Sequence, residues 1–169
     1  MNRLYHDKIK TRGSYFVTLR PLGFDGARIT GDAVMEEAVR ESCVDISGWD
    51  FPHWDTHARP VRGNRHVGQD SSWREHLELW RLFRSGQFLY CGGFRSDWST
   101  GESGERPAAE DLLLGVNDVL FRTLEIVLFA GRLYQRTGLQ CHGVTIRVEL
   151  RAVDQRRLRR HAPRFVPFG

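Results

Sequence analysis

Three cysteines in 169 residues are too few and too scattered for a disulfide framework. Cys43, Cys91 and Cys141 form no CxxC pair, so a zinc ribbon is also excluded and a reducing compartment is the default. No apolar run approaches the roughly 18 to 20 residues that a membrane span needs. The basic first residues are not followed by the apolar core of a targeting signal. We therefore expect a cytoplasmic protein that does not enter a membrane.

The sequence also lacks the short motifs of nucleotide enzymes. Gly92-Gly93 is an isolated pair, and neither GxGxxG nor GxxxxGK[ST] occurs. Enzymes that bind nucleotides use such loops because their backbone amides must approach a phosphate closely. No cofactor is therefore expected. Whether the chain is an enzyme stays open, with a non-catalytic role favoured.

Lysine is scarce, and the positive charge is concentrated at the two ends of the chain. Lys8 and Lys10 are the only lysines among 25 basic residues. Residues 1–20 carry a net charge of +4, residues 151–169 carry +5, and residues 21–150 carry −5. The length fits one domain over residues 1–169, with basic segments at residues 1–13 and 155–169. If the first and last strands are neighbours, these ends would form one positive patch.

The first half of the chain predicts short elements joined by irregular segments. Aromatic and β-branched residues predict a strand at Tyr15–Leu19 that stops at Pro21. Apolar residues on one helical face predict a short helix over residues 32–42. Residues 44–49 resemble a second short strand. Residues 50–73 have several Pro, Gly and polar residues without a clear period, which predicts a long irregular connection.

The second half carries the stronger patterns. Apolar runs at Leu77–Phe83 and Gln87–Phe94 flank a short Gly-containing link, which favours a β-hairpin over a helix at residues 75–84. After a polar loop at residues 99–110, apolar residues three to four apart predict one long helix over residues 107–137. Strict alternation predicts a strand at Val144–Arg151. The fold class is therefore α+β, an antiparallel sheet of about five strands packed against one long and one short helix.

One segment has the residue types of a metal site. His53, Asp55 and His57 stand at alternate positions, so in an extended chain they would point the same way, and His66 could supply a fourth ligand. The alternative is a surface loop whose polar side chains are solvated. The cysteines lack a suitably placed histidine, which favours buried structural thiols over a nucleophile.

Arginine supplies the candidate residues for binding nucleic acid or an acidic partner. Arg81 and Arg84 lie among the aromatic residues of the expected hairpin, a mixture that suits base stacking and phosphate contacts. The basic run near the C-terminus contributes Arg156, Arg157, Arg159 and Arg160. The alternatives are a hairpin with one face in the core and a solvated tail.

Four stretches, taken in order, resemble a region found in bacterial proteins. They are FVTLRPLGFDGARI (Phe16–Ile29), GWDFPH (Gly48–His53), EHLELWRLFRSGQFLYCGGFRSDW (Glu75–Trp98) and GVTIRVELRAVDQRRL (Gly143–Leu158). This region follows the Schlafen-type, AlbA-like nucleic-acid-binding domain, in some cases among defence genes. The resemblance spans most of the chain and transfers no catalytic residue. The Schlafen-type domain itself is absent from this sequence, so the resemblance implies an accessory module standing alone.

Three functions remain open from the sequence. The favoured one is a non-catalytic accessory or regulatory module that binds a protein partner or itself, in a defence or transcription-related assembly, because Arg and aromatic residues are enriched at interfaces. The second is nucleic-acid binding through the Arg-rich ends and the hairpin. The third is a metal-dependent hydrolase centred on the HWDTH segment.

Overall fold

A six-stranded antiparallel sheet forms the centre of the computed structural model, which describes residues 3–23, 28–73, 76–98, 113–139, 143–154 and 156–159. The strand order is β2-β3-β4-β5-β1-β7. The bounds are β1 (Ser14–Pro21), β2 (Val61–Arg62), β3 (His66–Trp73), β4 (His76–Phe83), β5 (Phe88–Gly93) and β7 (Val144–Arg151). The predicted α+β class is confirmed, with six strands in place of about five.

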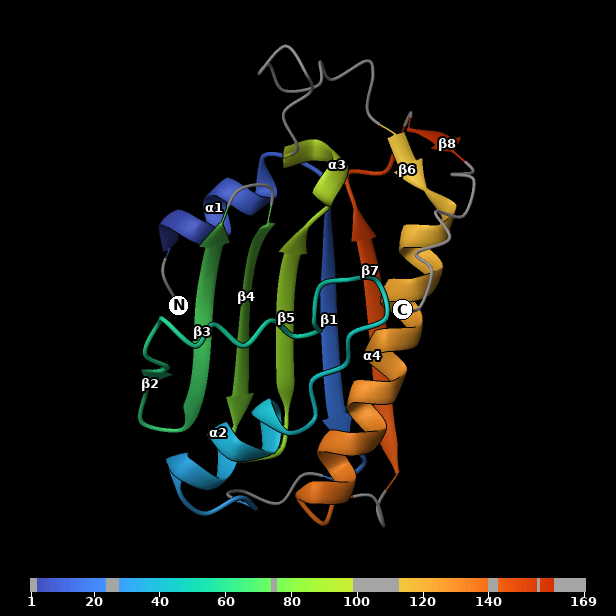
Figure 1. Cartoon of the computed structure of the whole chain (residues 1–169). Coiled ribbons are helices and arrows are strands. Elements are labelled where there is room, and N and C mark those ends of the chain that lie inside the picture. The colour runs from blue at the N-terminus through green and yellow to red at the C-terminus, as the bar shows by residue number, and fades with distance from the viewer. Residues whose placement is uncertain are drawn as a thin grey trace, which may run out of the picture.

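Helices cover both faces of this sheet (Figure 1). On one face lies α1 (Arg3–Lys10), whose Ile9 packs with Leu77 and Leu79 of β4. On the other face lie α2 (Asp32–Arg40) and the long α4 (Val116–Arg136). The side chains of β4 alternate between these two layers, and the strand is buried along most of its length because each face has a cover.

The larger core lies between the sheet and the α2–α4 layer. It contains the fully buried side chains of Val17, Leu19, Trp80, Phe88, Phe129 and Leu133. Phe88 and Phe129 bring β5 and α4 together, with ring centroids 4.8 Å apart. This contact holds α4 against the middle of the sheet.

The strongest sequence patterns are confirmed. Residues 76–83 and 88–93 form the expected hairpin, with Trp80 opposite Tyr90, so the alternative helix at residues 75–84 is wrong. The last predicted strand is β7, which pairs with β1 along its whole length. The first predicted strand is β1, which ends at Pro21 as expected. The short helix predicted over residues 32–42 is α2.

Three predictions of secondary structure need correction. Residues 44–49 form no strand, because only a single bridge joins Val44 to Phe51. The expected connection at residues 50–73 contains β2 and β3 in its second half. The long helix begins at residue 116, after β6 (Leu113–Gly115), and residues 107–112 lie outside the described part. So does the whole of the loop predicted at 99–110.

Three short elements lie close to the start of α4. In β8 (Arg157–Arg159) the chain runs parallel to β6, with Arg159 opposite Gly115. The one-turn helix α3 (Arg95–Trp98) follows β5, and Ser96 Oγ donates to the Leu113 carbonyl oxygen at 3.2 Å. None of the helices in the described ranges is both long and apolar enough to cross a membrane.

Candidate functional site

The irregular segment from residue 44 to 58 is held on the sheet by buried polar side chains. Gln69 of β3 donates through Nε2 to the carbonyl oxygens of Asp55 (2.9 Å) and Ala58 (3.0 Å). Its Oε1 accepts the Asp55 amide at 3.1 Å. Trp80 Nε1 donates to the His53 carbonyl oxygen at 3.1 Å. A chain with little regular structure therefore has fixed partners for its backbone groups.

Glu78 is a buried carboxyl group at the centre of this arrangement. Its Oε1 accepts the His53 amide at 2.7 Å, and its Oε2 accepts the Tyr90 hydroxyl at 3.0 Å. Burial raises the pKa of Glu78, although Arg122 and the hydrogen bonds partly oppose the shift. Burial also raises the pKa of Tyr90 well above its ordinary value, and the Glu78 carboxylate adds to the effect.

Glu125 of α4 is the second buried anchor for the segment. Its Oε1 accepts the amides of Ile46 (3.0 Å) and Ser47 (2.8 Å) and the Ser47 hydroxyl (2.8 Å). Its Oε2 lies 3.1 Å from Arg122 Nη1. The Arg122 pKa is raised, because the surrounding Tyr90, Glu125 and other acidic groups outweigh burial, which alone would lower it.

A cavity of about 90 Å³ lies between these groups and the sheet. Its lining includes Tyr15, Trp49, Glu78, Tyr90 and Arg122. A water molecule needs about 10 to 15 Å³ of such space, so the cavity has room for several waters or one small molecule. At its wall the Glu78 carboxyl group accepts the backbone amide of His53 in the 44–58 segment. We therefore assign this polar cluster the structural role of anchoring that segment.

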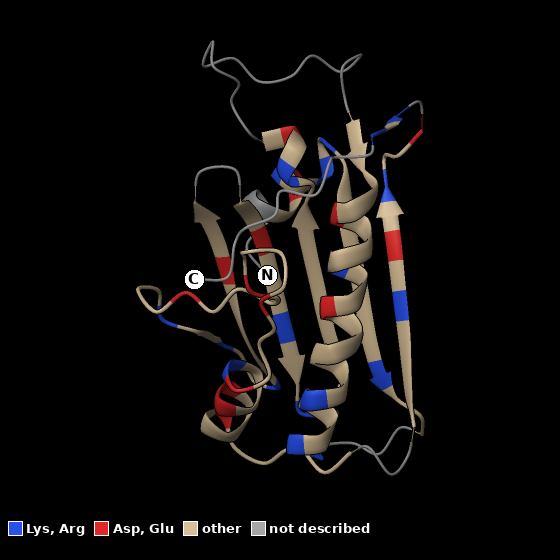
Figure 2. Ribbon diagram, turned by 45° about the vertical axis from the view of Figure 1, so that its right-hand side comes forward, with Lys and Arg blue, Asp and Glu red and all other residues tan. Residues whose placement is uncertain are grey.

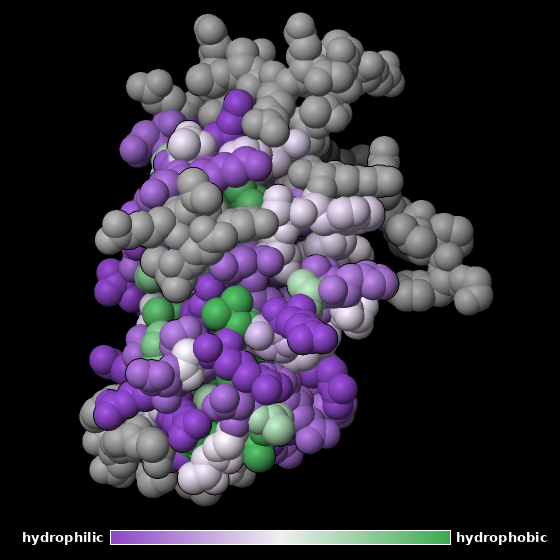
Figure 3. Space-filling model, turned by 90° about the vertical axis from the view of Figure 1, so that its left-hand side faces the viewer, coloured by the Kyte–Doolittle hydropathy of each residue, from purple (hydrophilic) through white to green (hydrophobic). Residues whose placement is uncertain are grey.

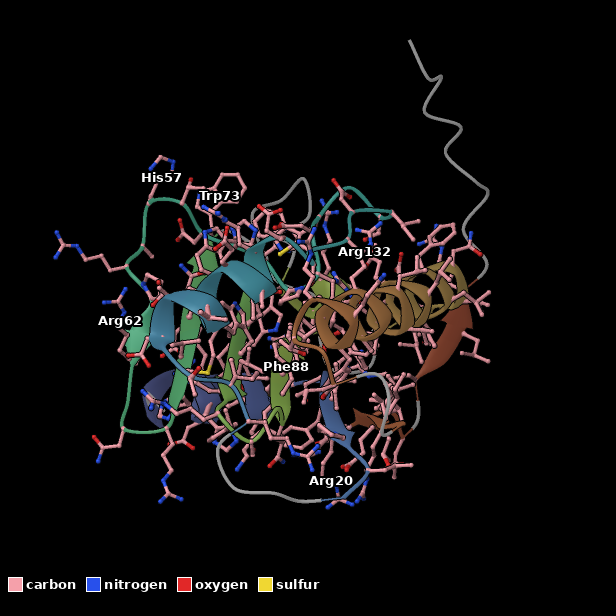
Figure 4. The ribbon with its side chains drawn as sticks, turned by 90° about the horizontal axis from the view of Figure 1, so that it is seen from below. Arg20, His57, Arg62, Trp73, Phe88 and Arg132 are labelled. Carbon is pink, nitrogen blue, oxygen red and sulfur yellow. The ribbon has the colours of Figure 1, made fainter. Side chains whose placement is uncertain are left out.

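The predicted metal ligands do not converge. His53 Nδ1 lies 2.5 Å from Asp50 Oδ1. Asp55 Oδ1 accepts the amides of His57 (2.8 Å) and Ala58 (3.2 Å), so it closes a local turn. His57 is exposed and points away from the sheet (Figure 4). Among the described residues no group of three His, Cys, Asp or Glu side chains could hold a metal ion, so the hydrolase hypothesis gains no support.

The two described cysteines have the environment of structural thiols. Burial raises the pKa of Cys43 to about 12, and Asp50 and Glu78 add to the shift. Burial raises the pKa of Cys91 to about 11. A thiol must ionise to act as a nucleophile, so both are unreactive near neutral pH. Cys141 lies outside the described residues.

Three of the six candidate arginines are occupied by acidic residues of the same chain. Arg81 is buried, binds Asp70 of β3 and donates to the Gln69 carbonyl oxygen at 3.0 Å. Arg84 Nη2 lies 3.1 Å from Asp32 Oδ1 at the start of α2. Arg156 is 3% exposed and forms a two-bond pair with the fully buried Asp97. The side chains of Arg81 and Arg156 are internal and hold elements together, so they are not free to bind a partner, whereas Arg84 is partly exposed and its binding role stays a prediction.

The described parts of the two basic ends include neighbouring strands, and two of their arginines, Arg151 and Arg156, pair with acidic residues of the same chain. The pairing of β1 with β7 confirms that the first and last long strands are neighbours. Arg151 nevertheless binds Glu149 at 3.0 Å. Arg157 and Arg159 are exposed on β8, and Arg160 lies outside the described residues. The nucleic-acid hypothesis stays a prediction, with two described residues left from its original set.

The outer face of α4 is a feature that the sequence reasoning missed. Its inner face is buried in the core at Ile126, Phe129 and Leu133. The opposite face carries five apolar side chains that are 39% to 61% exposed: Leu120, Phe121, Leu124, Val127 and Leu128. We call these five residues the α4 stripe. The sequence reasoning used Leu120, Leu124, Val127 and Leu128 as the periodic apolar residues that predict this helix. It did not recognise that a second apolar row, at Ile126, Phe129 and Leu133, would face the core and leave the first row exposed.

The surroundings of the stripe contain little charge. Figure 2 shows α4 as a mainly uncharged ribbon with acidic and basic residues at few positions. The opposite edge of the sheet, near β2 and β3, shows a mostly hydrophilic described surface in Figure 3. Ile146 of β7 is also partly exposed, and it belongs to the edge strand next to β1. The α4 stripe is therefore the strongest candidate for a binding surface.

Comparisons with known proteins found no match for this chain. No family model, no curated protein and no solved structure matches the chain. The resemblance to the region that follows the Schlafen-type domain therefore stays a prediction. Any functional conclusion rests on the geometry of the described residues.

Proposed function

We propose that this protein is a non-catalytic binding module that associates with protein through the α4 stripe. The observation that carries the proposal is the row of five exposed apolar side chains on a helix whose inner face already fills the core. A helix at the surface of a monomer normally turns a polar face to solvent. A contiguous apolar face of this kind marks a protein-binding site.

The composition of the stripe supports the same conclusion. Leucine, valine and phenylalanine gain free energy when they leave water, about 25 cal/mol for each Å² of apolar surface. The stripe contains no charged side chain, so its burial carries no desolvation penalty for an ion. Arg122 and Glu125, which interrupt it in sequence, turn inward and pair with each other.

The buried polar groups favour binding over catalysis. Two buried carboxyl groups, Glu78 of β4 and Glu125 of α4, accept backbone amides and fix the 44–58 segment. The two described thiols are held in their neutral form. The described polar clusters thus act on the protein's own backbone, which fits a module that works by association.

Site-specific photo-crosslinking in cells tests the proposal. A photoreactive amino acid is placed at residue 124, and in a matched control at residue 34. Val34 is an exposed apolar residue of α2 with 54% exposure, close to the 47% of Leu124. We expect a discrete adduct from position 124 and none from position 34. No adduct at 124, or equal adducts at both positions, would contradict the proposal.

A further inference from the structure

We propose that the cavity at the start of α4 is a binding site for a small monocarboxylate, whose oxygens accept hydrogen bonds from Arg122 and Tyr15. The cavity lies on the inner side of α4, apart from the α4 stripe, so the proposal goes beyond the proposed function and does not depend on it. Three features of the cavity support it: the donors that the fold leaves without acceptors, the acceptors that are already in use, and the size of the space.

The cavity lies where the ends of several elements meet. Its wall is built by the starts of β1, β4 and α4, the end of β5, and α3, which gather at the upper end of the sheet in Figure 1. Trp49 of the 44–58 segment adds a further side. The exposed Ser47 and Asp118 also line the cavity, so it opens to solvent between this segment and α4. A small solute can therefore enter while the sheet stays intact.

Two donor groups at the wall have no acceptor among the described residues. Arg122 carries several N–H donors but forms no hydrogen bond within the described part of the chain. Its Nη1 lies 3.1 Å from Glu125 Oε2, where the two buried atoms are not aligned for a hydrogen bond. The Tyr15 hydroxyl also lacks a described partner, and burial raises its pKa, so it keeps its proton. Buried donors are rarely left unpaired, so their acceptors come from whatever fills the cavity.

The buried carboxyl group at the wall is already in use as an acceptor. Glu78 Oε1 accepts the His53 amide at 2.7 Å, and its Oε2 accepts the Tyr90 hydroxyl at 3.0 Å. Burial also raises the pKa of Glu78, which favours its neutral form and lowers the negative charge at the wall. The described wall therefore offers spare donors in its buried part. An anion that accepts hydrogen bonds matches this wall better than a cation or a neutral donor.

Arg122 supplies the positive charge for such an anion. Burial alone would lower its pKa, but the surrounding tyrosine and glutamate groups raise it overall, so the guanidinium group stays charged. Glu125 faces it, yet Glu125 Oε1 already accepts three hydrogen bonds, two of them from Ser47, which stabilise its charge independently. The exposed residues of the lining include both Arg95 and Asp118, which have opposite charges. A guanidinium group can hold both oxygens of a carboxylate through parallel N–H groups.

The size and the aromatic lining of the cavity limit the rest of the ligand. A volume of about 90 Å³ has room for about six water-sized groups. Aromatic rings form much of the wall, and Tyr15 and Phe94 meet edge to face with their centroids 4.8 Å apart. Ligand sites combine apolar walls of this kind with a few placed polar groups. A carboxylate with a short hydrocarbon chain, such as acetate or propanoate, fits both parts.

Titration of the ¹⁵N-labelled full-length protein with acetate and propanoate, followed by NMR, tests the proposal. The indole N–H of Trp49 is the reporter, because Trp49 lines the cavity and its Nε1 has no described acceptor. We expect a saturable shift with a Kd of about 0.1 to 10 mM, the range open to so small a ligand. Propanamide, which lacks the charge, should bind at least about tenfold more weakly. No saturable shift up to about 100 mM, or equal affinity for propanamide, would overturn the proposal.

A matched pair of tyrosine variants tests the hydroxyl donor. Tyr15→Phe removes the hydroxyl and keeps the ring, so the Kd for propanoate should rise about threefold to tenfold. Tyr134→Phe is the control, because Tyr134 is also buried but lies outside the cavity lining and donates to the Gly86 carbonyl oxygen at 2.8 Å. It should leave the Kd unchanged. The NMR spectrum shows whether both variants are folded, and equal Kd values for the two would contradict the role of Tyr15.

Two further variants test the charge of Arg122. The double variant Arg122→Gln/Glu125→Gln removes both members of the ion pair together, so it leaves neither charge buried alone. It should raise the Kd for propanoate more than about tenfold, because the carboxylate loses its cationic partner. Glu125→Gln alone keeps Arg122 and removes the competing carboxylate, so it should bind propanoate at least as tightly as the parent protein. Unchanged binding by the double variant, or weaker binding by Glu125→Gln, would overturn the proposal.

Discussion

Glu125 Oε1 accepts the backbone amide of Ser47 at 2.8 Å, which ties the longest helix to a segment nearly 80 residues earlier in the chain. The same oxygen also accepts the Ile46 amide and the Ser47 hydroxyl. The carboxylate is fully buried on α4, and its second oxygen faces Arg122. One side chain of α4 therefore fixes both the helix and the irregular segment beside it.

Replacing this anchor should loosen the segment and destabilise the fold. Glu125→Ala leaves three donors and the Arg122 charge without their acceptor, and we expect a loss of about 3 to 5 kcal/mol. For a chain of this size each kcal/mol lowers Tm by about 2 to 4 °C. Hydrogen exchange should also rise at residues 45–50.

Glu41→Ala is the control variant. It breaks the exposed pair with Arg136 and should change stability by less than about 1 kcal/mol. Equal effects of the two variants would contradict the anchoring role.

The pair of Arg156 and Asp97 should be a major source of stability at the basic end. Asp97 also accepts the Gly13 amide at 2.8 Å, so the pair joins α3 to the chain before β1. Arg156→Ala should cost about 3 to 5 kcal/mol, because it leaves a buried carboxylate without its partner. Arg62→Ala breaks the exposed pair with Glu36 and should cost at most about 1 kcal/mol. Chemical denaturation measures both variants, and a small loss for Arg156→Ala would show that Arg156 is solvated.

The contact of His53 with Asp50 should shift the titration of this histidine. Burial lowers the pKa of His53, but the Asp50 hydrogen bond and charge outweigh it, so the net shift is upward from 6.5. The Asp50 pKa is lowered from 3.8, because bonds to His53 and to the Trp54 amide outweigh its burial. NMR should place the His53 midpoint above 6.5, and Asp50→Asn should lower it. His66, whose pKa is lowered by burial and by Arg81, should titrate below 6.5 in both proteins.

The same pair predicts a pH window of extra stability. A raised histidine pKa contributes stability that is complete below 6.5 and is lost as pH rises through the folded value. A lowered carboxyl pKa contributes stability that is present above 3.8 and is lost as pH falls through the folded value. The stability difference between the parent protein and Asp50→Asn should therefore be largest between pH 3.8 and 6.5. A difference that is flat from pH 3 to pH 9 would contradict the contact.

Most replacements of a buried carboxylate destabilise a protein, but Glu78→Gln should become more stable than the parent protein as pH rises. Because burial raises the Glu78 pKa from 4.5, the folded parent protein favours the protonated form and loses stability as pH rises through the folded value. Glutamine keeps an oxygen for the His53 amide and cannot ionise. Glu78→Gln should therefore gain stability relative to the parent as pH rises, whereas Glu78→Ala should lose about 1 to 3 kcal/mol. Thermal melts from pH 4 to pH 8 measure both, and a loss for Glu78→Gln that grows with pH would contradict the upward shift.

Two glycines should respond oppositely to alanine. A Cβ at Gly131 meets no atom within 4 Å in the interior of α4, so Gly131→Ala should stabilise the protein by about 0.5 to 1 kcal/mol. A Cβ at Gly68 would overlap the Trp80 carbonyl oxygen and the Arg81 side chain. Gly68→Ala should therefore separate β3 from β4 locally and cost about 1 to 3 kcal/mol. The change in Tm shows whether each substitution stabilises or destabilises the protein. An unchanged Tm for Gly68→Ala would show that β3 and β4 are less closely paired at this position.

Regular apolar patterns were sufficient to predict much of the fold. The alternation at Val144–Arg151 identified β7, because a strand with one covered face repeats every two residues. The hairpin of β4 and β5 followed from two apolar runs and a short Gly-containing link. The body of α4 was also evident, although its start was placed nine residues early, at residue 107. That boundary was missed because Leu113 and Leu114 fit the helical spacing but pair with β8.

Strand β3 was missed because its pattern is polar. Gln69 and Ser71 are buried on it, yet sequence reasoning reads such residues as exposed. Gln69 is accommodated because it forms hydrogen bonds with the 44–58 segment, and that segment packs there only in the folded chain. Its partners lie 11 and 14 residues away, with no periodic signal between them.

The sequence by itself determined the α+β class, the main strands and helix, and the concentration of basic residues at the two ends. These properties follow from local periodicity and composition, which need no knowledge of the partners in space. Only the tertiary structure decided that Arg81 and Arg156 are internal, because their acidic partners come from other elements. It also decided that the α4 stripe is exposed. A helix with two apolar rows can be covered by other elements on both rows or on one row only, and its sequence does not say which. That choice depends on which elements pack around α4, and the described elements cover its inner face alone.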